Sequence, residues 1–332
     1  MGNPEVSVII PFRDSIKTIE RSIKSILNQS FQKFELVVVN DGSTDGSKEI
    51  VEDIRDERLQ QINLAAGGTV IALNEGIYSA KSEIIALLDP YDSATGERIE
   101  KQLNYLQLHS DCPVVSSCVH YIQDSTSRHI RPYINWTNSL VSRDDIFQRR
   151  FVNATVLNST LMFRKSLMTT CGLFEDGEFP EDYEMILRWM SRGIPIHKLD
   201  EELIEWYDDE QRLSRRHLRY NSAAATKIKS KYFKKWLTEY FRTSPDILLW
   251  SNDSLSMKKV NQLESEGLNI VGYINENGQS KNGMDERPVF SLDEKPSRVL
   301  IVYYMEQFEP EEIPSLLIEK GLEEGVNFIT MS

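Results

Sequence analysis

The sequence predicts an α/β protein in two parts: a large sheet with helices on both faces, then a smaller domain of the same class. Over the first 110 residues, short unbroken apolar runs alternate with longer stretches whose apolar residues recur every three to four positions. After Pro245 the same alternation begins again. The chain has 332 residues, of which 40% are hydrophobic, so it is long enough to bury two cores.

Three unbroken apolar runs are expected to be neighbouring strands. They are residues 6–10 (VSVII), 36–39 (LVVV) and 84–88 (IIALL). Helices are expected between them, because the apolar residues of 19–27 and of 50–54 recur at helical spacing. Strands that are apolar on both faces and joined by helices form parallel sheets, so we expect these three runs to belong to one parallel sheet.

The remaining elements are expected at wider intervals. Strand-like segments lie near 113–122 and 159–164, and a helix begins at Pro180, where Glu181 and Asp182 suit its positive end, and stops at Gly193. Beyond Pro245 we expect strands at 247–250, 269–274 and 298–304, and helices ending near 266 and starting at 311. The domains predicted are therefore 1–240 and 245–332.

Polar and acidic residues follow each of the first three strands, at 11–14, 40–45 and 89–92. Aspartate is common in turns, so any one of these segments could be a turn and nothing more. In open α/β sheets, however, ligands bind beyond the carboxyl ends of the strands. Three acidic strand ends at one edge of the sheet therefore favour a binding site.

Composition excludes several classes of protein. A formal net charge of -13 argues against a general nucleic-acid binder, which needs a basic surface. Cys112, Cys118 and Cys171 form no CxxC pair and are odd in number, so we expect neither a disulfide framework nor a zinc site. No stretch of about 20 apolar residues occurs, so no membrane span is predicted. We expect a cytoplasmic protein.

Four segments resemble, in order and spacing, the successive motifs of family 2 glycosyltransferases, which are inverting enzymes with the GT-A fold. The segments are VSVIIPFRDS (6–15), VVVNDGSTDGS (37–47), ALNEGIYSAKSEIIALLDPYD (72–92) and GLFEDGEFPEDYEMILRWMSRG (172–193). The resemblance covers roughly residues 4–215. It implies the doubly wound mixed sheet of nucleotide-diphospho-sugar transferases. It also implies transfer of a sugar from a nucleoside diphosphate donor, UDP-linked, to a glycan hydroxyl in polysaccharide or surface-glycan biosynthesis.

The resemblance also implies which residues bind the donor. Asp41 matches the aspartate that contacts the donor's base, and Pro11 and Arg13 match residues beside it. Asp89 and Tyr91 match donor-binding positions of the family's DxD-type motif, Tyr91 in place of an acid that would meet the ribose.

Asp92 matches the last acid of the DxD-type motif, which in the family usually contacts a divalent metal, so Mn²⁺ or Mg²⁺ is the expected cofactor. Asp182, with Glu181 beside it, matches the acidic pair that supplies the catalytic base, and Asp182 is the expected base. The simpler explanation of this acidic pair is that its negative charges stabilise the positive end of the helix dipole.

Two departures from the family pattern bear on the metal. Pro90 and Tyr91 occupy the middle of a motif that in the family usually reads like DSDD, so that Tyr91 stands in place of one acid. A Tyr-Arg-x-His element of the family corresponds to WYDDE at 206–210, which has no histidine. If the metal needs the lost acid, its binding weakens. The arginines at 212, 215 and 216 could compensate for the missing histidine as bidentate hydrogen-bond donors to the diphosphate.

Residues 212–242 hold ten Lys or Arg and one acid, Glu239. Their lysines alternate with aromatic residues, which suits either a solvated helix or the anionic inner face of a membrane carrying a lipid-linked acceptor. The second domain is loosely similar to Rossmann-like domains but lacks their glycine-rich loop, since SNDSLSMKK follows its first strand. We expect it to serve packing or homo-oligomerisation.

Two other functions stay open from the sequence. The altered motif at 89–92 and Glu210 are compatible with a binding or scaffolding protein that kept the fold and lost the chemistry. A nucleotidyltransferase would need a loop rich in glycine and arginine after the first strand, where only Arg13 is available. The glycosyltransferase remains the favoured prediction.

Overall fold

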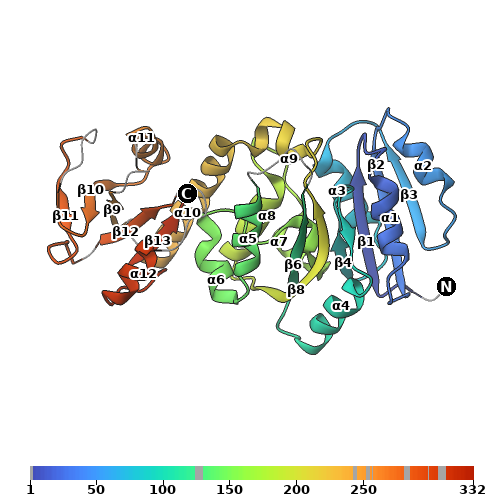
Figure 1. Ribbon diagram of the computed structural model, residues 1–332, viewed down its shortest axis with the longest axis horizontal. Coiled ribbons are helices and arrows are strands. Elements are labelled where there is room, and N and C mark those ends of the chain that lie inside the picture. Colours follow the sequence, from blue (N-terminus) through green and yellow to red (C-terminus); the bar gives the residue numbers. More distant parts are fainter. Residues whose placement is uncertain are drawn as a thin grey trace. The chain divides into compact units, whose positions relative to one another are not determined.

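The structure is a computed structural model that describes residues 3–123, 130–241, 245–251, 255, 257–279, 285–297, 299–305 and 312–332. The chain divides into two compact units (Figure 1). The first comprises residues 1–146 and 155–220, and the second 147–154 and 221–332. The expected domain bounds, 1–240 and 245–332, remain a prediction.

The first unit contains a mixed sheet with the strand order β3-β2-β1-β4-β7-β6-β8-β5. Its strands are β1 (Val6–Phe12), β2 (Phe34–Asp41), β3 (Leu59–Leu64), β4 (Ile84–Leu87), β5 (Ser93–Ala94), β6 (Val114–Ile122), β7 (Met162–Arg164) and β8 (Ile196–Tyr207). Strands β3, β2, β1 and β4 are parallel, β7 runs antiparallel between β4 and β6, and β8 is parallel to β6. The expected mixed α/β sheet is confirmed.

The helices of this unit include those that the sequence predicts after β1, after β2 and at Pro180. They are α1 (Ile19–Leu27), α2 (Ser47–Asp53), α3 (Thr69–Ser79), α4 (Arg98–Leu108), α5 (Arg131–Ser139), α7 (Ser166–Cys171), α8 (Glu181–Ser191) and α9 (Leu213–Arg216). Short 3₁₀ turns occur at Asn158–Thr160 and Leu218–Tyr220, and α6 (Arg143–Gln148) runs to the start of the segment 147–154.

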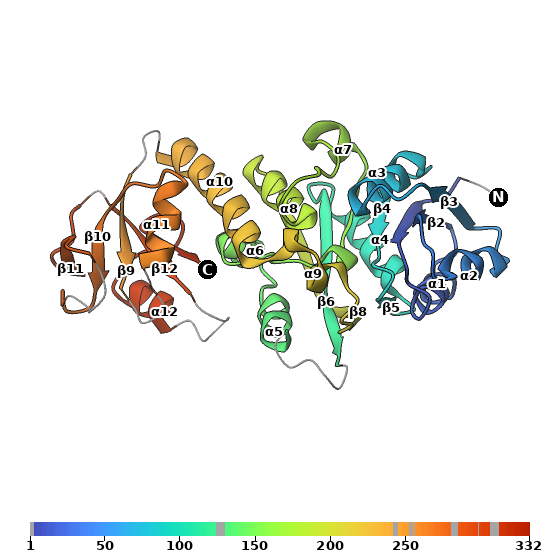
Figure 2. The same ribbon diagram turned by 90° about the horizontal axis from the view of Figure 1, so that it is seen from above.

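Helices cover both faces of the parallel half of this sheet. Gly76 of α3 lies against Ile9 of β1, so closely that a Cβ atom on Gly76 would be 2.5 Å from Ile9 Cγ2. Val8 and Ile10 point to the opposite face because side chains alternate along a strand, and they share a core cluster with Ile23 of α1. Helices α1 and α3 therefore lie on opposite faces (Figure 2).

The second unit contains a parallel sheet with the order β11-β10-β9-β12-β13. Its strands are β9 (Asp246–Trp250), β10 (Ile270–Asn275), β11 (Val289–Ser291), β12 (Val299–Tyr304) and β13 (Phe328–Met331), and its helices are α10 (Ser222–Phe241), α11 (Met257–Ser265) and α12 (Glu312–Glu319). The expected second parallel α/β sheet is confirmed. Residues 252–254 and 256, after β9, lie outside the described residues.

Helix α10 carries the second half of the basic segment. Its lysines at 231, 234 and 235 are exposed, whereas Lys229 is buried and its Nζ donates to the carbonyl of Val152. The aromatic residues among these lysines mostly face inward: Tyr232 and Phe233 are buried, and Phe233 packs edge-on against Phe151. Within this unit, the exposed side of α10 therefore presents lysines with few aromatic rings.

Candidate functional site

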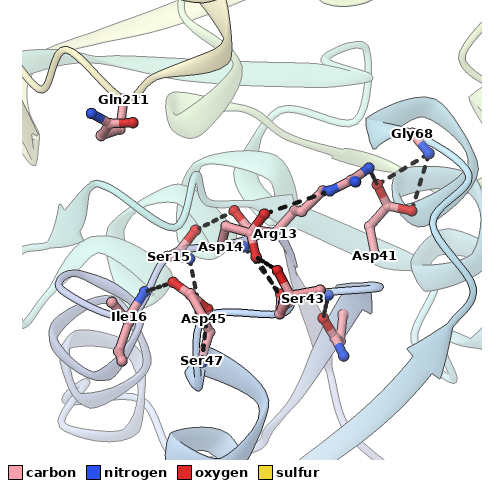
Figure 3. Close-up of polar contacts among 12 residues, drawn as sticks. Arg13, Asp14, Ser15, Ile16, Asp41, Ser43, Asp45, Ser47, Gly68 and Gln211 are labelled. Carbon is pink, nitrogen blue, oxygen red and sulfur yellow. Dashed lines mark hydrogen bonds and ion pairs between the residues drawn. The ribbon is translucent and has the colours of Figure 1, made fainter.

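Asp41, the last residue of β2, joins that strand to the start of α3. Its Oδ1 accepts a hydrogen bond from the backbone N–H of Gly67 at 2.6 Å. The N–H of Gly68 donates to both Oδ1 and Oδ2, at 3.0 Å each (Figure 3). The approach is close: Gly42 has φ +68°, and a Cβ atom there would be 2.7 Å from Ala66 N. Only glycine fits at position 42 without displacing backbone, so the turn holds Asp41 in a fixed orientation.

The loop that follows β1 is tied to the loop that follows β2. Asp14 (φ 47°) accepts a hydrogen bond from Thr44 N–H at 2.8 Å, and its own N–H donates to Ser43 Oγ at 3.1 Å. Arg13 Nη1 lies 3.6 Å from Asp41 Oδ2, and half of the Arg13 side chain is exposed (Figure 3). Pro11 lies in β1 opposite Val39. The residues of these two loops that were predicted to bind the nucleotide-sugar are thus neighbours.

The segment 89–92 after β4 is a tight turn. The N–H of Asp92 donates to the carbonyl of Asp89 at 3.0 Å, and the N–H of Tyr91 donates to Asp89 Oδ1 at 3.0 Å. The Tyr91 hydroxyl donates to the carbonyl of Gln211 at 3.1 Å. The turn therefore exists, as the simpler reading of the sequence expects, and it also brings two carboxylates to the edge where β1 and β2 end.

Asp92 is fully buried and both of its oxygens are engaged. Ser159 Oγ donates to Oδ2 at 2.6 Å, the N–H of Tyr207 lies 3.3 Å from Oδ1, and Arg212 Nη2 donates to Oδ1. Burial raises the pKa of Asp92 to about 6, although the Arg212 charge opposes this. At neutral pH the two residues form a buried ion pair.

These contacts do not fit a divalent cation at Asp92. Mg²⁺ and Mn²⁺ need open oxygen ligands in direct contact, and Arg212 already covers the carboxylate. The position where the family has histidine holds Glu210, which is exposed, while Asp208 is paired with Arg215 and Tyr121. Within the described ranges, no group of three or more His, Cys, Asp or Glu is arranged to hold a metal.

The expected catalytic pair opens helix α8, but its two carboxyl groups differ. Glu181 is buried: the Tyr220 hydroxyl donates to its Oε1 at 2.5 Å, and Arg219 Nη1 lies 3.6 Å from Oε2. Asp182 is half-buried, and its Oδ1 accepts from the N–H of Tyr183. Of the pair, Asp182 is therefore the carboxylate that no other side chain in the described parts of the chain engages.

The charges of these groups act on one another. Burial is the main cause that raises the pKa of Asp182, and the Asp89 charge adds to it. Burial and then the Asp182 charge raise the pKa of Glu181 to about 7. The charges of Asp89, after β4, and Asp182, at the start of α8, therefore act on each other. Sequence reasoning missed Ser159, Arg219 and Tyr220, whose positions carry no motif.

Glu181 predicts a pH dependence of stability. A carboxyl whose pKa is raised on folding holds its proton more tightly in the folded state, so its contribution is fully present below its ordinary pKa, 4.5, and is lost as the pH rises through about 7. Glutamine does not titrate, so Glu181→Gln lacks this loss. Between these two pH values the free energy of unfolding of the wild type should therefore fall by roughly 3 kcal/mol relative to that of Glu181→Gln. Urea unfolding across that range measures it.

Asp176→Asn is the matched control for this measurement, because exposed Asp176 also pairs with Arg219. Its unfolding free energy should run parallel to that of the wild type over the same pH range. Parallel curves for Glu181→Gln and the wild type would contradict the prediction.

The mixed sheet is structurally similar to that of GT-A glycosyltransferases such as TarS, and this defines the class of fold. Residues 7–170 match the family model described as Glycosyl transferase family 2. The chain belongs to the family 2 glycosyltransferases. The matched region ends before α8, so the roles of Glu181 and Asp182 are not covered by it.

Among curated relatives, the uncharacterized glycosyltransferase EpsJ of Bacillus subtilis is 28% identical over 243 residues, which are 70% of this chain and 69% of EpsJ. An uncharacterized glycosyltransferase of Rickettsia bellii is 28% identical over 183 residues, 55% of this chain but 25% of that protein. One from Haemophilus influenzae is 30% identical over 190 residues, 54% of this chain and 58% of the relative. Several relatives are thus matched over much less than two thirds of their length.

Two solved structures share the fold. S. aureus TarS 1-349 in complex with UDP-GlcNAc has a TM-score of 0.54 and 19% identity, and the match covers 79% of this chain and 71% of TarS. The mannosyltransferase PcManGT of Pyrobaculum calidifontis, in complex with GDP-Man and Mn²⁺, has a TM-score of 0.51 and 18% identity, with 73% and 65% covered. At these identities the likeness supports the fold alone.

Proposed function

We propose that this chain is an inverting glycosyltransferase that moves a sugar from a UDP-linked donor to a hydroxyl of a glycan acceptor. One observation carries the proposal: Asp41 and the Asp89–Asp92 turn lie at one edge of one sheet, and the charge of Asp89 acts on Asp182. The edge is the one where the parallel strands β1, β2 and β4 end, and it is where open α/β sheets bind ligands.

The donor end of the site is built from Asp41, Arg13 and Pro11. A carboxylate held by the backbone of Gly67 and Gly68 presents a fixed acceptor, which suits the N–H of a nucleotide base. We assign UDP as the nucleotide, as in TarS, which is in complex with UDP-GlcNAc. PcManGT is in complex with GDP-Man, so GDP is the alternative nucleotide to test. Asp89 and Tyr91, in the turn after β4, are assigned to binding of the same nucleotide-sugar donor.

The chemistry is a single displacement. The bond between the sugar's anomeric carbon and the diphosphate oxygen breaks, and its electron pair leaves with the diphosphate. The acceptor oxygen forms the new bond from the opposite face, and its proton passes to Asp182. Burial raises the pKa of Asp182, which makes it a stronger base, and inversion at the anomeric carbon follows because there is one displacement.

The cofactor expected from the sequence was Mn²⁺ or Mg²⁺ at Asp92. The contacts of Asp92 with Arg212, Ser159 and Tyr207 do not favour this, and no step of the proposed reaction passes through a metal ion.

The acceptor is proposed to be a growing or lipid-linked glycan of polysaccharide or surface-glycan biosynthesis. In the described parts of the chain, no helix has the length and apolarity needed to cross a membrane. The exposed lysines of α10, at 231, 234 and 235, are the groups proposed for contact with an anionic membrane surface, each adding about 1 kcal/mol. A cytoplasmic position at the inner face of the membrane and a homo-oligomer are further parts of this proposal.

A thermal-stability screen against UDP-sugars and GDP-sugars tests the donor. A donor present at about 100 times its dissociation constant adds ~2.7 kcal/mol of stability and raises the melting temperature. We expect at least one UDP-sugar to do so and to release UDP in the presence of an acceptor hydroxyl. If no nucleotide-sugar stabilises the protein, the proposal is wrong.

A binding or scaffolding protein is the second candidate, and the Arg212–Asp92 pair favours it, because that pair occupies the position that the family uses for a metal. The two candidates differ in turnover. A scaffold binds a nucleotide-sugar without releasing the nucleotide, whereas the enzyme releases it at a rate that depends on Asp182.

A further inference from the structure

Arg212 occupies the place that the family resemblance gives to the metal. Its Nη2 donates to Asp92 Oδ1, and its Nη1 lies 3.7 Å from Asp89 Oδ1. The guanidinium therefore contacts both carboxylates that survive from the DxD-type motif.

The arginine is held in one orientation. Its Nε donates to the carbonyl of Tyr207 at 2.8 Å, and its guanidinium carbon lies 4.0 Å from the centre of the Trp206 ring. Burial alone lowers the pKa of Arg212, but the charges of Asp92 and Asp89 outweigh it and raise the pKa. A planar guanidinium fixed by a carbonyl, a ring and a carboxylate is a preorganised positive charge.

One nitrogen of the guanidinium keeps its hydrogen-bonding capacity, although the Arg212 side chain is only 5% exposed. Nη1 makes no hydrogen bond in the described structure, since its contact with Asp89 Oδ1, at 3.7 Å, is an ion pair beyond hydrogen-bonding distance. A phosphate oxygen can therefore accept a hydrogen bond from Nη1 without displacing an existing one. Charge-assisted bonds of this kind are stronger than neutral ones.

We propose that Arg212 replaces the divalent cation at the leaving diphosphate, so that this transferase binds its donor without a metal ion. The proposal rests on the proposed function. Arg212 Nη1 binds a diphosphate oxygen and stabilises the negative charge that develops there. Asp92, which the sequence suggested as a metal ligand, becomes the positioning residue that orients Arg212, together with Ser159 and Tyr207.

Calorimetric titration of the full chain with UDP and with GDP, in EDTA and then in MnCl₂, tests this. For the wild type we expect binding of one nucleotide in EDTA and a change of less than about threefold when Mn²⁺ is added. For Arg212→Met we expect the affinity in EDTA to fall by about tenfold or more, because a charged hydrogen bond is worth roughly 1.5–3 kcal/mol.

The metal response separates a diphosphate contact from a merely structural role. In Arg212→Met the carboxylates of Asp89 and Asp92 are uncovered, so Mn²⁺ should restore part of the lost affinity. A structural defect would weaken binding equally with and without the metal. Arg212→Lys keeps a positive charge and guards against a folding failure; it should also lose affinity in EDTA, because lysine lacks the planar fork.

Arg216→Gln is the matched control: it removes the same charge from the same segment, and Arg216 is exposed and bonded to Gln211 Oε1. Its affinity in EDTA should match the wild type. Wild-type binding that disappears in EDTA and returns with Mn²⁺ would overturn the role of Arg212 and leave the proposed function standing. Absence of binding by either nucleotide in both conditions would overturn the proposed function as well.

Discussion

Asp182→Asn is expected to reduce sugar transfer by about 10²–10⁴-fold while leaving the affinity for UDP unchanged. Asparagine keeps the size of the side chain and can still accept the hydrogen bond from the N–H of Tyr183, but it cannot take a proton from the acceptor hydroxyl. Steady-state release of UDP measures the first effect, and calorimetry with UDP measures the second.

Two variants give this experiment its controls. Glu181→Gln should retain much more activity than Asp182→Asn, because Glu181 is already engaged by Tyr220 and Arg219. Asp176→Asn removes an exposed charge close to the same helix and should behave like the wild type. If Asp182→Asn turns over at the wild-type rate, or if Glu181→Gln is the more damaged of the two, the assignment of the base to Asp182 is wrong.

The pH profile gives an independent check of the same residue. A base acts only when it is deprotonated, and burial raises the pKa of Asp182. Wild-type activity should therefore fall on the acid side at a higher pH than an ordinary aspartate would give, and the residual activity of Asp182→Asn should lack that limb. An acid limb that is identical in both proteins would assign the titration to another group.

The parallel half of the fold could be predicted because its signals are local. The runs at 6–10, 36–39 and 84–88 became β1, β2 and β4, since strands buried on both faces read as unbroken apolar stretches. Because the carboxyl ends of parallel strands meet at one edge of a sheet, the acidic residues after these strands could be predicted to lie at that edge. The helix at Pro180 was predicted with its N-terminal acids, and α8 begins at Glu181.

The antiparallel part and the partners of the site could not be predicted in the same way. Strand β8 spans Ile196–Tyr207, but Asp200, Glu201 and Glu202 interrupt its apolar pattern. Arg212 lies 120 positions from Asp92 in the sequence, so nothing local indicates that the two pair. From the sequence, three arginines were candidates for the hydrogen-bond donor to the diphosphate. Their contacts in the structure distinguish them: Arg212 pairs with Asp92, Arg215 pairs with Asp208, and exposed Arg216 donates to Gln211.

The turn at 89–92 illustrates why a motif and a turn are not alternatives. Asp89 uses Oδ1 to accept from Tyr91 N–H, as aspartates do in turns, and the same oxygen lies 3.7 Å from Arg212. The turn orients the carboxylates, and Arg212 neutralises part of their charge. The replacement of a family acid by Tyr91 then has a physical consequence: the phenol hydroxyl donates to the carbonyl of Gln211, next to Arg212.

Asp41→Asn is expected to weaken UDP binding by about 10- to 100-fold. The buried carboxylate of Asp41 accepts hydrogen bonds from Gly67 and Gly68 through both oxygens and faces Arg13. Asparagine has one carbonyl oxygen, so its NH₂ group takes the place either of Oδ1, facing the N–H groups of Gly67 and Gly68, or of Oδ2, facing Gly68 N–H and Arg13. Both arrangements set donor against donor, and the charge that orients Arg13 is lost.

Asp14→Asn is the matched control, because Asp14 lies in the adjoining loop with φ 47°, a conformation that asparagine also adopts, and an amide oxygen can still accept from Thr44 N–H. Its affinity for UDP, measured by calorimetry, should stay within about twofold of the wild type. Thermal unfolding of both variants separates binding from folding. A loss of stability in Asp41→Asn with unchanged UDP affinity would mean that Asp41 only holds the loop before α3, whereas a loss of affinity in a folded protein supports its contact with the donor.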